Sequence, residues 1–453
     1  MGALAAPLVS SPWPRARGGV PDARFSLGAV TLALALPLIF LHARYQPDFG
    51  FGAGGTTVDI TLSDLAVLAV AIVAALSIRE QGLRRLRPGL PVWIAAGTLL
   101  ALVLVSLSYP LLRNQPYDWH VRLVSALKFC EYAVLAPAIV LLLRRREDAY
   151  LPLRSFIVWS AAATGWGLLQ YVGAVNEFAG KRPAQREPSF LGIHDFAALS
   201  GGALMLGVVA LAFADNGVVP RALAWIATVA GGLGIIISGA MTAVVGMWLA
   251  VITVVLVTYR GRTLTRRAAL GIVTVTVLVT LGTAGIRGTV LKDFAAFLGI
   301  TQNPTPGAVE SYSQRTVLGY IGWRIFRTEP ITGVGYQGSS EEWAYGPQLP
   351  AARSRFPSQP AAAFPSSAHP WGVQNLPIQT LADLGLIGFA VLASLFGIGL
   401  WLGVSGAATR AAPLVGVAWL LVAAGVWNGL GIVPGIPLAA LTWLGFGLVT
   451  IRE

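Results

Sequence analysis

The sequence predicts an all-α fold, a polytopic membrane helix bundle of about 12 transmembrane helices, with a long outer loop that carries amphipathic helices. Composition is the first reason. Hydrophobic residues make up 55% of the chain and charged residues 11%, and the mean hydropathy of +0.69 exceeds that of soluble domains. The second reason is that apolar runs long enough to cross about 30 Å of hydrocarbon recur along the chain.

The apolar runs define the candidate spans. They cover 26–42, 60–78, 90–109, 121–143, 152–173, 191–213, 221–238, 240–258, 268–286, 376–402, 411–428 and 433–450. The pair on either side of Gly239 is joined only by the tripeptide Ser-Gly-Ala. Merging this pair would leave eleven spans and reverse the orientation of those that follow.

The distribution of arginine decides between these alternatives. With the N-terminus in the cytosol, the arginine-rich ends all fall on the cytosolic side, as the positive-inside rule requires. These residues are Arg15, Arg17, Arg24, Arg79, Arg84, Arg85, Arg87, Arg144, Arg145, Arg146, Arg154, Arg260, Arg262, Arg266 and Arg267. The rule therefore favours twelve spans with both termini in the cytosol. The net charge of +12 is a consequence of this topology and does not indicate nucleic-acid binding.

The same pattern predicts the domain organisation. Residues 1–25 carry arginines but no apolar core or cleavage site, so we expect a cytosolic N-terminal tail rather than a cleaved signal peptide. A transmembrane bundle of about nine helices follows over 26–286, with an outer loop at 174–190. A long outer loop covers 287–375, and the last three transmembrane helices lie in 376–453. Long ordered loops are frequently functional.

The long loop contains the stretch SYSQRTVLGYIGWRIFRTEP at 311–330. Its apolar residues recur at helical spacing, which predicts an amphipathic helix at the outer membrane interface that ends at Pro330. They are Val317, Leu318, Ile321, Ile325 and Phe326. The prolines of 347–370 predict an irregular, mobile segment.

The sequence GVGYQG at 333–338 matches a dinucleotide-binding fingerprint by its letters alone. That motif requires a preceding strand, a following helix and an acidic residue about twenty positions later, and this context is missing from the sequence. We expect instead a tight glycine turn that lets the backbone approach its neighbours closely.

Two groups of titratable residues invite other functions. Lys128 and Glu131 are three positions apart in one span, so we expect them to face the interior and neutralise each other; a proton relay is the alternative. The histidines are all predicted on the outer side, without metal-binding spacing or a helping cysteine, so we predict no metal site and no cofactor. They are His42, His120, His194 and His369.

Three loose motifs follow one another between about 180 and 390: KRPAQREPSFLGIHDFAALSGG, QRTVLGYIGWRIFRTEPITGVGY and QNLPIQTLADLGLIGF. Their order and spacing resemble those of the O-antigen ligase and O-antigen polymerase superfamily. Its members typically show an arginine before a helix start, an arginine followed by Trp and Pro-x-x-Gly-x-Gly, and His-Asn before an acidic-x-Gly-x-x-Gly helix. The matching residues are Arg186, Ile193, His194 and Asp195; Arg315, Trp323, Pro330, Gly333 and Gly335; and Asn375, Asp383, Gly385 and Gly388.

The resemblance implies a GT-C-like membrane glycosyltransferase of the bacterial plasma (inner) membrane. Such an enzyme transfers or polymerises a glycan from an undecaprenyl diphosphate carrier onto an acceptor hydroxyl at the outer face, without a metal. Its partners are the lipid-linked donor, a glycan or lipid acceptor and membrane lipids, but no nucleic acid. A departing diphosphate develops negative charge, and arginine is always protonated and binds phosphate oxygens bidentately.

The resemblance also suggests roles for individual residues. The predicted catalytic residues are Arg186, Arg315 and His369, and the predicted substrate-binding residues are Arg182, His194, Asp195, Arg324, Gln374 and Asn375. The chain departs from the family at Gln374, where members carry histidine, because glutamine cannot act as a general base near neutral pH. His369, His194 or Asp195 would have to replace it, or the substrate would activate its own acceptor.

Simpler interpretations of the arginines remain open. Arg315 could reach lipid headgroups from an interfacial helix, Arg186 could be a solvated loop charge, and Arg324 and Arg327 could seat the helix on the membrane. A solute transporter of the same superfamily and a non-catalytic partner in polysaccharide assembly are the competing functions. The enzyme hypothesis predicts that Arg186, Arg315 and a histidine line one cavity that opens to the outer leaflet.

Overall fold

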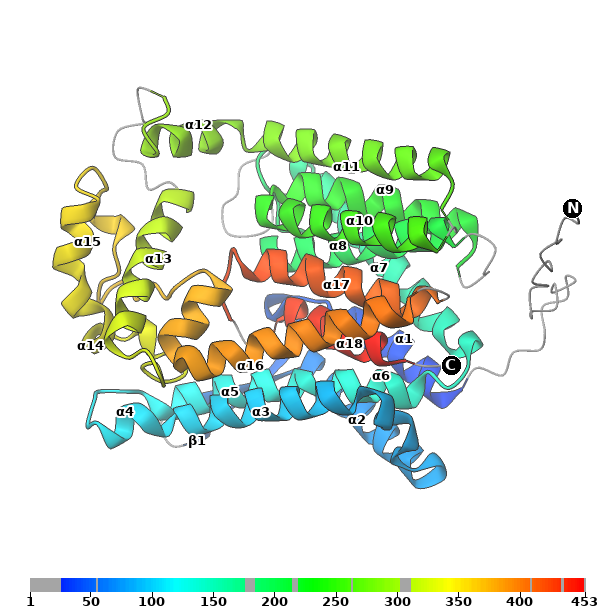
Figure 1. Ribbon diagram of the computed structural model, residues 1–453, viewed down its shortest axis with the longest axis horizontal. Coiled ribbons are helices and arrows are strands. Elements are labelled where there is room, and N and C mark those ends of the chain that lie inside the picture. Colours follow the sequence, from blue (N-terminus) through cyan, green and yellow to red (C-terminus); the bar gives the residue numbers. More distant parts are fainter. Residues whose placement is uncertain are drawn as a thin grey trace, which may run out of the picture.

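The computed structural model of the chain describes residues 26–53, 56–175, 184–213, 219–261, 264–301, 311–407, 410–432 and 436–451. Most of the helices lie side by side in a bundle (Figure 1). They are α1 (Leu27–Ile39), α2 (Leu62–Gln81), α3 (Leu90–Ser106), α5 (Trp119–Ala133), α6 (Leu135–Leu142), α7 (Tyr150–Tyr171), α8 (Ile193–Ala212), α9 (Arg221–Ser238), α10 (Met241–Arg260), α11 (Arg266–Ile286), α16 (Leu376–Gly406), α17 (Ala411–Trp427) and α18 (Pro437–Thr450).

A second group of helices gathers beyond one end of the bundle, at the left of Figure 1. They are α4 (Ser108–Leu112), α12 (Gly288–Phe297), α13 (Ser311–Thr328), α14 (Glu342–Tyr345) and α15 (Leu349–Arg355). We call this the loop end. The chain leaves α18 at the opposite end, here called the C-terminal end (Figure 1).

Every predicted span coincides with a helix of the bundle, except that the span predicted at 121–143 is formed by two helices, α5 and α6. Within the described residues, eight helical stretches are long and apolar enough to cross a membrane, while α1, α17 and α18 are shorter apolar helices. The chain is thus a multi-pass membrane protein, and the count of twelve spans stays a prediction.

The junction between the two uncertain spans separates two helices. Gly239 has a φ of +59°, and its N–H donates to the carbonyl oxygens of Ile235 and Ile236 at 3.2 and 3.0 Å. This left-handed residue closes α9 in the way typical of a helix C-terminus. As a result, α9 and α10 are separate helices that run in opposite directions (Figure 1).

The sequence did not predict the antiparallel hairpin of β1 (Asp48–Ala53) and β2 (Thr56–Thr61), in which Asp48 pairs with Thr61. The all-α prediction therefore holds for the bundle and omits these strands. The glycines of β1 hide the alternation by which a strand is normally predicted, although β2 is rich in β-branched residues.

The direct ion pair of Lys128 differs from the predicted one with Glu131. Lys128 forms its ion pair with Asp64 of α2, at 3.1 Å, and its Nζ also donates to the carbonyl oxygen of Asp59 at 3.0 Å. Spacing within one helix could not show this contact, because the acceptors come from a neighbouring helix and the hairpin that precedes it.

The amphipathic helix exists as α13, but its apolar face does not lie on the membrane. Val317, Ile321 and Ile325 are at most 2% exposed and pack with Phe364 in a second hydrophobic core at the loop end. The segment 347–370 is also more ordered than predicted, since it contains α15 and contributes buried residues to this core. These long-range contacts explain both corrections.

The glycine turn is confirmed and fills a break in α16. Gly385 has a φ of +65°, so the helix is interrupted there. The loop 330–335 supplies the missing backbone partners: Val334 N–H donates to Ala382 O (2.9 Å), Gly335 N–H to Asp383 O (2.8 Å), and Leu386 N–H to Pro330 O (2.8 Å). The turn therefore has a structural role, as an insert that completes the broken helix.

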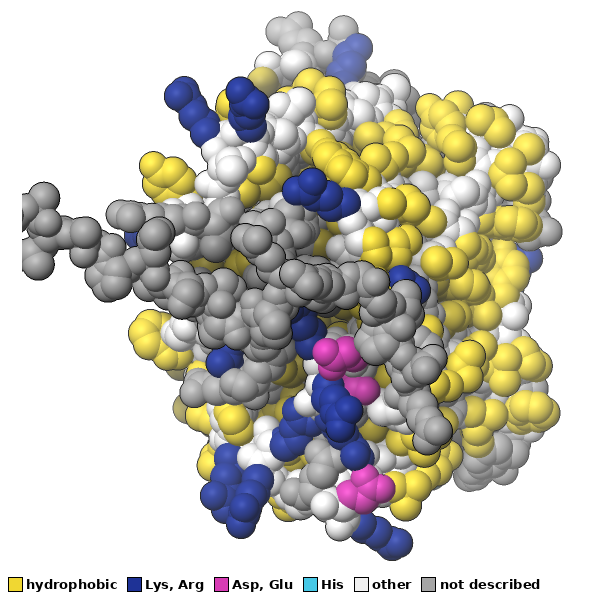
Figure 2. Space-filling model, turned by 90° about the vertical axis from the view of Figure 1, so that its right-hand side faces the viewer, with side chains coloured by type: hydrophobic (Ala, Val, Ile, Leu, Met, Phe, Trp, Pro, Cys, Tyr) yellow, Lys and Arg dark blue, Asp and Glu magenta, His cyan; other side chains and the backbone are white. Residues whose placement is uncertain are grey.

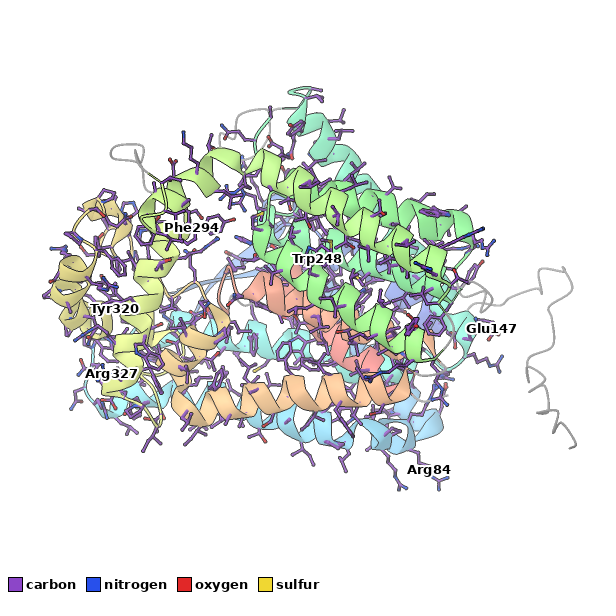
Figure 3. The ribbon with its side chains drawn as sticks, turned by 45° about the horizontal axis from the view of Figure 1, so that its top comes forward. Arg84, Glu147, Trp248, Phe294, Tyr320 and Arg327 are labelled. Carbon is purple, nitrogen blue, oxygen red and sulfur yellow. The ribbon has the colours of Figure 1, made fainter. Side chains whose placement is uncertain are left out.

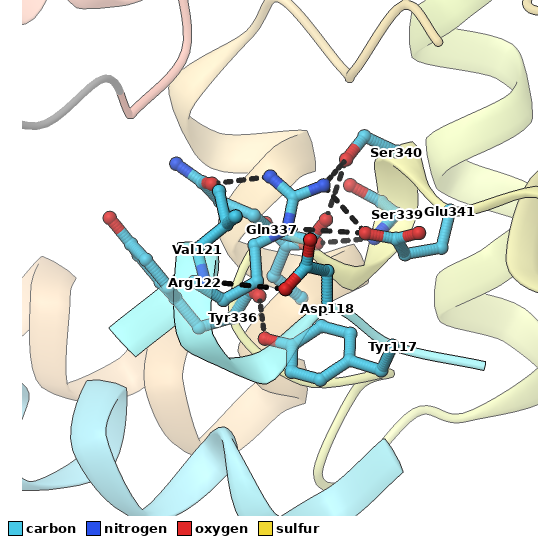
Figure 4. Close-up of polar contacts among 10 residues, drawn as sticks. Tyr117, Asp118, Val121, Arg122, Tyr336, Gln337, Ser339, Ser340 and Glu341 are labelled. Atoms are coloured by element: carbon cyan, nitrogen blue, oxygen red, sulfur yellow. Dashed lines mark hydrogen bonds and ion pairs between the residues drawn. The ribbon is translucent and has the colours of Figure 1, made fainter. Parts of the chain in front are cut away.

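Arg122 of α5 and Tyr117 hold residues 336–341, which follow this loop (Figure 4). The Arg122 guanidinium donates to Gln337 Oε1 at 2.7 Å, to Ser340 Oγ at 3.1 Å and to Glu341 Oε1 at 2.6 Å. The Tyr117 hydroxyl donates to the carbonyl oxygen of Tyr336 at 2.6 Å. These bonds attach the loop end to the bundle.

Replacing Arg122 with alanine is expected to lower the free energy of unfolding by about 2 kcal/mol, because Glu341 is left partly buried without its partner. Both side chains of the pair are only 22% and 21% exposed. Arg113→Ala is the matched control: Arg113 pairs with Glu329 but is 44% exposed, so a loss below about 1 kcal/mol is expected. Thermal unfolding in detergent measures both, and equal losses would contradict the assignment.

Basic side chains gather at the C-terminal end (Figure 2). Arg144 forms an ion pair with Glu80 at 2.7 Å, and Arg85 donates to the carbonyl oxygens of Leu143 and Arg144 at 3.3 and 3.0 Å. Figure 3 shows Arg84 at this end and Arg327 at the loop end. The segments predicted to face the cytosol therefore share one end, and the orientation in a membrane stays a prediction.

Candidate active site

Three arginines from different parts of the chain converge at the loop end. Arg186 precedes α8, Arg287 directly follows α11, and Arg315 lies near the start of α13. Burial, followed by the positive charges of Arg287 and Arg315, lowers the pKa of Arg186 to about 10. Arg186 is still protonated at neutral pH, so the site holds like charges close together.

Gly239 makes room for two of these arginines. A Cβ atom at this position would lie 3.0 Å from Arg186 Cβ and 3.3 Å from Arg287 Cδ. Any larger residue would crowd both side chains as well as strain the left-handed backbone. The turn between α9 and α10 thus shapes the arginine cluster, which we define as Arg186, Arg287 and Arg315.

The segment that carries Arg186 is held firmly by the bundle. The Glu187 N–H donates to the carbonyl oxygen of Ile237 at 2.9 Å. The Ser189 hydroxyl donates to Ala163 O at 2.7 Å, and Gln170 Nε2 donates to Ser189 O at 3.2 Å. Arg186 is therefore placed by α7 and α9 and is not a solvated loop charge.

Arg315 contacts two residues that the sequence had singled out. Its Nε donates to Gln374 Oε1 at 3.1 Å, and its Nη2 lies 3.4 Å from His194 Nε2. A guanidinium group can only donate, so His194 must accept through Nε2 and carry its proton on Nδ1. His194 is neutral in this arrangement, with its unprotonated Nε2 facing Arg315.

The cluster presents donors that lack acceptors. Arg186 Nε and Arg287 Nε are buried, and neither has a hydrogen-bond partner within the described parts of the chain. The guanidinium carbons of Arg287 and Arg315 lie 5.3 and 5.9 Å from the ring centre of Tyr312. Buried donors without acceptors are costly, so this arrangement suits an anionic ligand that would satisfy them.

The structure brings together four of the predicted site residues: Arg186, Arg315, His194 and Gln374. Two others cap helices. Asp195 Oδ1 accepts from Leu438 N–H at 2.9 Å at the start of α18, and Asn375 Oδ1 accepts from Ile378 N–H at 3.0 Å at the start of α16. These contacts are structural, and a binding role for either residue stays a prediction.

Two further predicted residues, Arg324 and His369, lie outside the arginine cluster. Arg324 Nε donates to Gln348 Oε1 at 2.9 Å, which links α13 to the turn before α15. His369 is exposed and stacks on Trp371 with ring centres 5.7 Å apart. Arg182 falls outside the described residues. The role predicted for His369 is untested, while His194 is the histidine in contact with Arg315.

Arg287 is the functional candidate that the sequence reasoning missed. It is 7% exposed and follows an apolar span directly. An arginine at the predicted outer end of a span runs against the positive-inside rule, and this was the signal available in the sequence. Tyr312 and Gly239 gave no such signal, because their importance depends on which arginines they touch.

Among the described residues, no group of three or more His, Cys, Asp or Glu side chains could hold a metal ion. The polar atoms of the cluster are mainly donors, which repel a cation. The prediction of metal independence is left to experiment.

Comparison with known proteins finds a family match over part of the chain. Residues 226–393 match the family model described as O-antigen ligase. No curated protein matches the chain. The match covers α10, α11 and α13, and with them Arg287, Arg315 and Gln374. The family is associated with the transfer or polymerisation of glycans at membranes, and its activity is like that of a glycosyltransferase. Residues 226–393 are therefore similar to the O-antigen ligase family, which supports the resemblance to the O-antigen ligase and polymerase superfamily.

Proposed function

We propose that the protein transfers or polymerises a glycan from an undecaprenyl diphosphate carrier onto an acceptor hydroxyl, at the outer face of a bacterial plasma membrane. The carrying observation is the arginine cluster, whose buried Nε atoms of Arg186 and Arg287 lack partners in the described chain. A diphosphate supplies the acceptors that these donors need, and its charge offsets their mutual repulsion.

The reaction is a displacement at the anomeric carbon of the donor sugar. The acceptor oxygen forms a bond to this carbon while the bond to the diphosphate oxygen breaks. The electron pair leaves with the diphosphate, and the arginine cluster stabilises the developing charge. The hydroxyl proton must go to a base, and we assign this role to His194 Nε2, which the contact with Arg315 requires to be unprotonated.

Gln374 replaces the family histidine without replacing its chemistry. Its Oε1 accepts from Arg315 Nε at 3.1 Å, so its role in our proposal is to orient Arg315 toward the diphosphate. This division leaves proton transfer to a residue of α8. It also predicts that the protein is active without a histidine at position 374.

The location of the charges favours an enzyme over a solute transporter. Transporters place their substrates at broken helices near the membrane midplane. The break at Gly385 of α16 is filled by the loop 330–335 of the same chain. The arginine cluster lies instead at the loop end of the bundle, which in our proposal faces outward while both termini stay in the cytosol.

Reconstitution tests the proposed function and the base together. Purified protein in vesicles that contain undecaprenyl diphosphate-linked glycan is supplied with an acceptor glycan, and transfer is followed by the size of the labelled product. Activity should persist in EDTA. His194→Gln should slow transfer by about 100-fold with little change in donor affinity, while His369→Gln should leave it within about twofold. A large loss of transfer in His369→Gln with little loss in His194→Gln would assign the base to His369. If the wild type transferred no glycan, the enzyme hypothesis would be contradicted.

A further inference from the structure

A row of aromatic rings continues outward from the arginine cluster. Tyr312, beside Arg287 and Arg315, lies 5.5 Å from Phe294 of α12, measured between ring centres. Phe294 stacks on Phe297 at 5.9 Å, Phe297 stacks on Phe356 at 5.9 Å, and Phe356 meets Tyr320 edge to face at 5.5 Å. We call Tyr312, Phe294, Phe297, Phe356 and Tyr320 the aromatic row.

The aromatic row lies at the edge of the second hydrophobic core, against which Tyr320 and Phe356 pack. All five residues are partly exposed, and no residue of α12 is fully buried. Neighbouring rings in a hydrophobic core usually lose nearly all of their exposure. Here the rings join α12, α13 and the end of α15 while part of each remains accessible.

The direction of the row distinguishes two possible ligands. A polyprenyl chain bound at the arginine cluster must run back along the bundle helices to reach the membrane interior. The row runs the other way, because α12, α13 and α15 lie beyond the ends of those helices (Figures 1 and 3). Figure 3 shows Phe294 and Tyr320 together at this end. The direction is the one that the sugar part of the donor must take.

The chemistry of the row also fits sugars. The C–H faces of a pyranose carry partial positive charge and stack on the negative faces of aromatic rings. The Arg355 guanidinium lies 5.8 Å from the ring centre of Phe356 and is exposed, so it offers donors to hydroxyl groups beside the rings. A hydrocarbon tail would gain nothing from this charge.

We infer that the aromatic row is a glycan-binding platform, which holds the pyranose residues of the lipid-linked donor that follow its diphosphate. This inference rests on the proposed function, since the arginine cluster defines where the diphosphate lies. It adds the part of the site that recognises the sugars. Stacking is tolerant of sugar identity, so the platform would select pyranose chains by their faces and length rather than by a single hydroxyl group.

Binding measurements separate the platform from the diphosphate site. The probes are undecaprenyl diphosphate and undecaprenyl diphosphate bearing an N-acetylglucosamine disaccharide, titrated into the purified protein in detergent. The wild type should bind the sugar-bearing lipid about fivefold more tightly than the bare lipid. Phe297→Leu keeps apolar volume but removes the ring, and it should abolish this difference. Phe297→Tyr should retain it.

Trp323→Leu is the matched control. Trp323 is an exposed aromatic residue of α13 that pairs with Phe326 instead of the row, at 5.2 Å. This variant should keep the fivefold preference. If Phe297→Leu kept the preference for the sugar-bearing lipid, the platform would be overturned. If Phe297→Leu lost affinity for the bare lipid, the platform would also be overturned, and the row would be assigned to the polyprenyl chain. Failure of the proposed function is seen separately, as bare-lipid affinity that does not change in Arg315→Ala.

Discussion

Arg315→Ala is expected to reduce glycan transfer by about 100- to 1,000-fold, comparable with the loss of a single donor that stabilises transition-state charge. Arg315 is the member of the arginine cluster that contacts both His194 and Gln374, so its removal also frees these two side chains. Arg287→Ala should have a similar effect, although no sequence motif marks Arg287. Transfer in reconstituted vesicles measures both variants.

Arg327→Ala is the control for charge on the same helix. Arg327 is exposed and lies at the far end of α13 (Figure 3). Its loss should change transfer by no more than about twofold. Arg315→Lys helps to interpret the result, because a lysine keeps the charge but cannot bind a diphosphate bidentately. Full activity in Arg315→Ala, with normal insertion into the membrane, would contradict the proposed role of the cluster.

Gly385→Ala is expected to destabilise the protein by about 3–5 kcal/mol and to lower its yield sharply. The new Cβ atom would lie 2.2 Å from the carbonyl oxygen of Ile331, and the backbone φ of +65° disfavours a side chain. The obstacle is backbone, which cannot rotate away as a side chain can. The loop 330–335 would have to leave the break in α16, which exposes several backbone groups.

Gly397→Ala provides the matched control in the same helix. No atom lies within 4 Å of a Cβ added at Gly397. Alanine should therefore be neutral or should stabilise α16 by up to about 1 kcal/mol, because it favours the helix more than glycine does. Thermal unfolding followed by tryptophan fluorescence compares the two. Equal melting temperatures for Gly385→Ala and the wild type would mean that the loop does not fill the break.

The fold was largely predictable because its main signal is local. Each span is an apolar run of sufficient length, and the distribution of arginine correctly separated α9 from α10. The hairpin β1–β2 escaped prediction because its glycines conceal the alternation of a strand. The helix α13 was predicted by its period but wrongly placed on the membrane, because periodicity shows which face is apolar without showing what covers it.

The candidate site was predictable in part. Arg186 and Arg315 stood out because charge is scarce at the predicted outer ends and because their motifs resemble a known family. His194 was one of three proposed substitutes for the missing histidine, and its contact with Arg315 distinguishes it from His369 and Asp195. The predicted partner of Lys128 was not its direct partner, Asp64, because the residue spacing within one helix carries no information about ion pairs to another helix.

The length and apolar character of each run are properties of neighbouring residues, so they were sufficient to predict a multi-pass helical protein and the order of its elements. The meeting of Arg186, Arg287 and Arg315 is different, since these residues are far apart in the chain and converge only in the folded structure. Gly239 illustrates the reason. In the sequence a glycine indicates only a turn, whereas in the folded chain the absence of its side chain leaves the space that Arg186 and Arg287 occupy. Contacts of this kind depend on how helices pack in three dimensions, which no local pattern encodes.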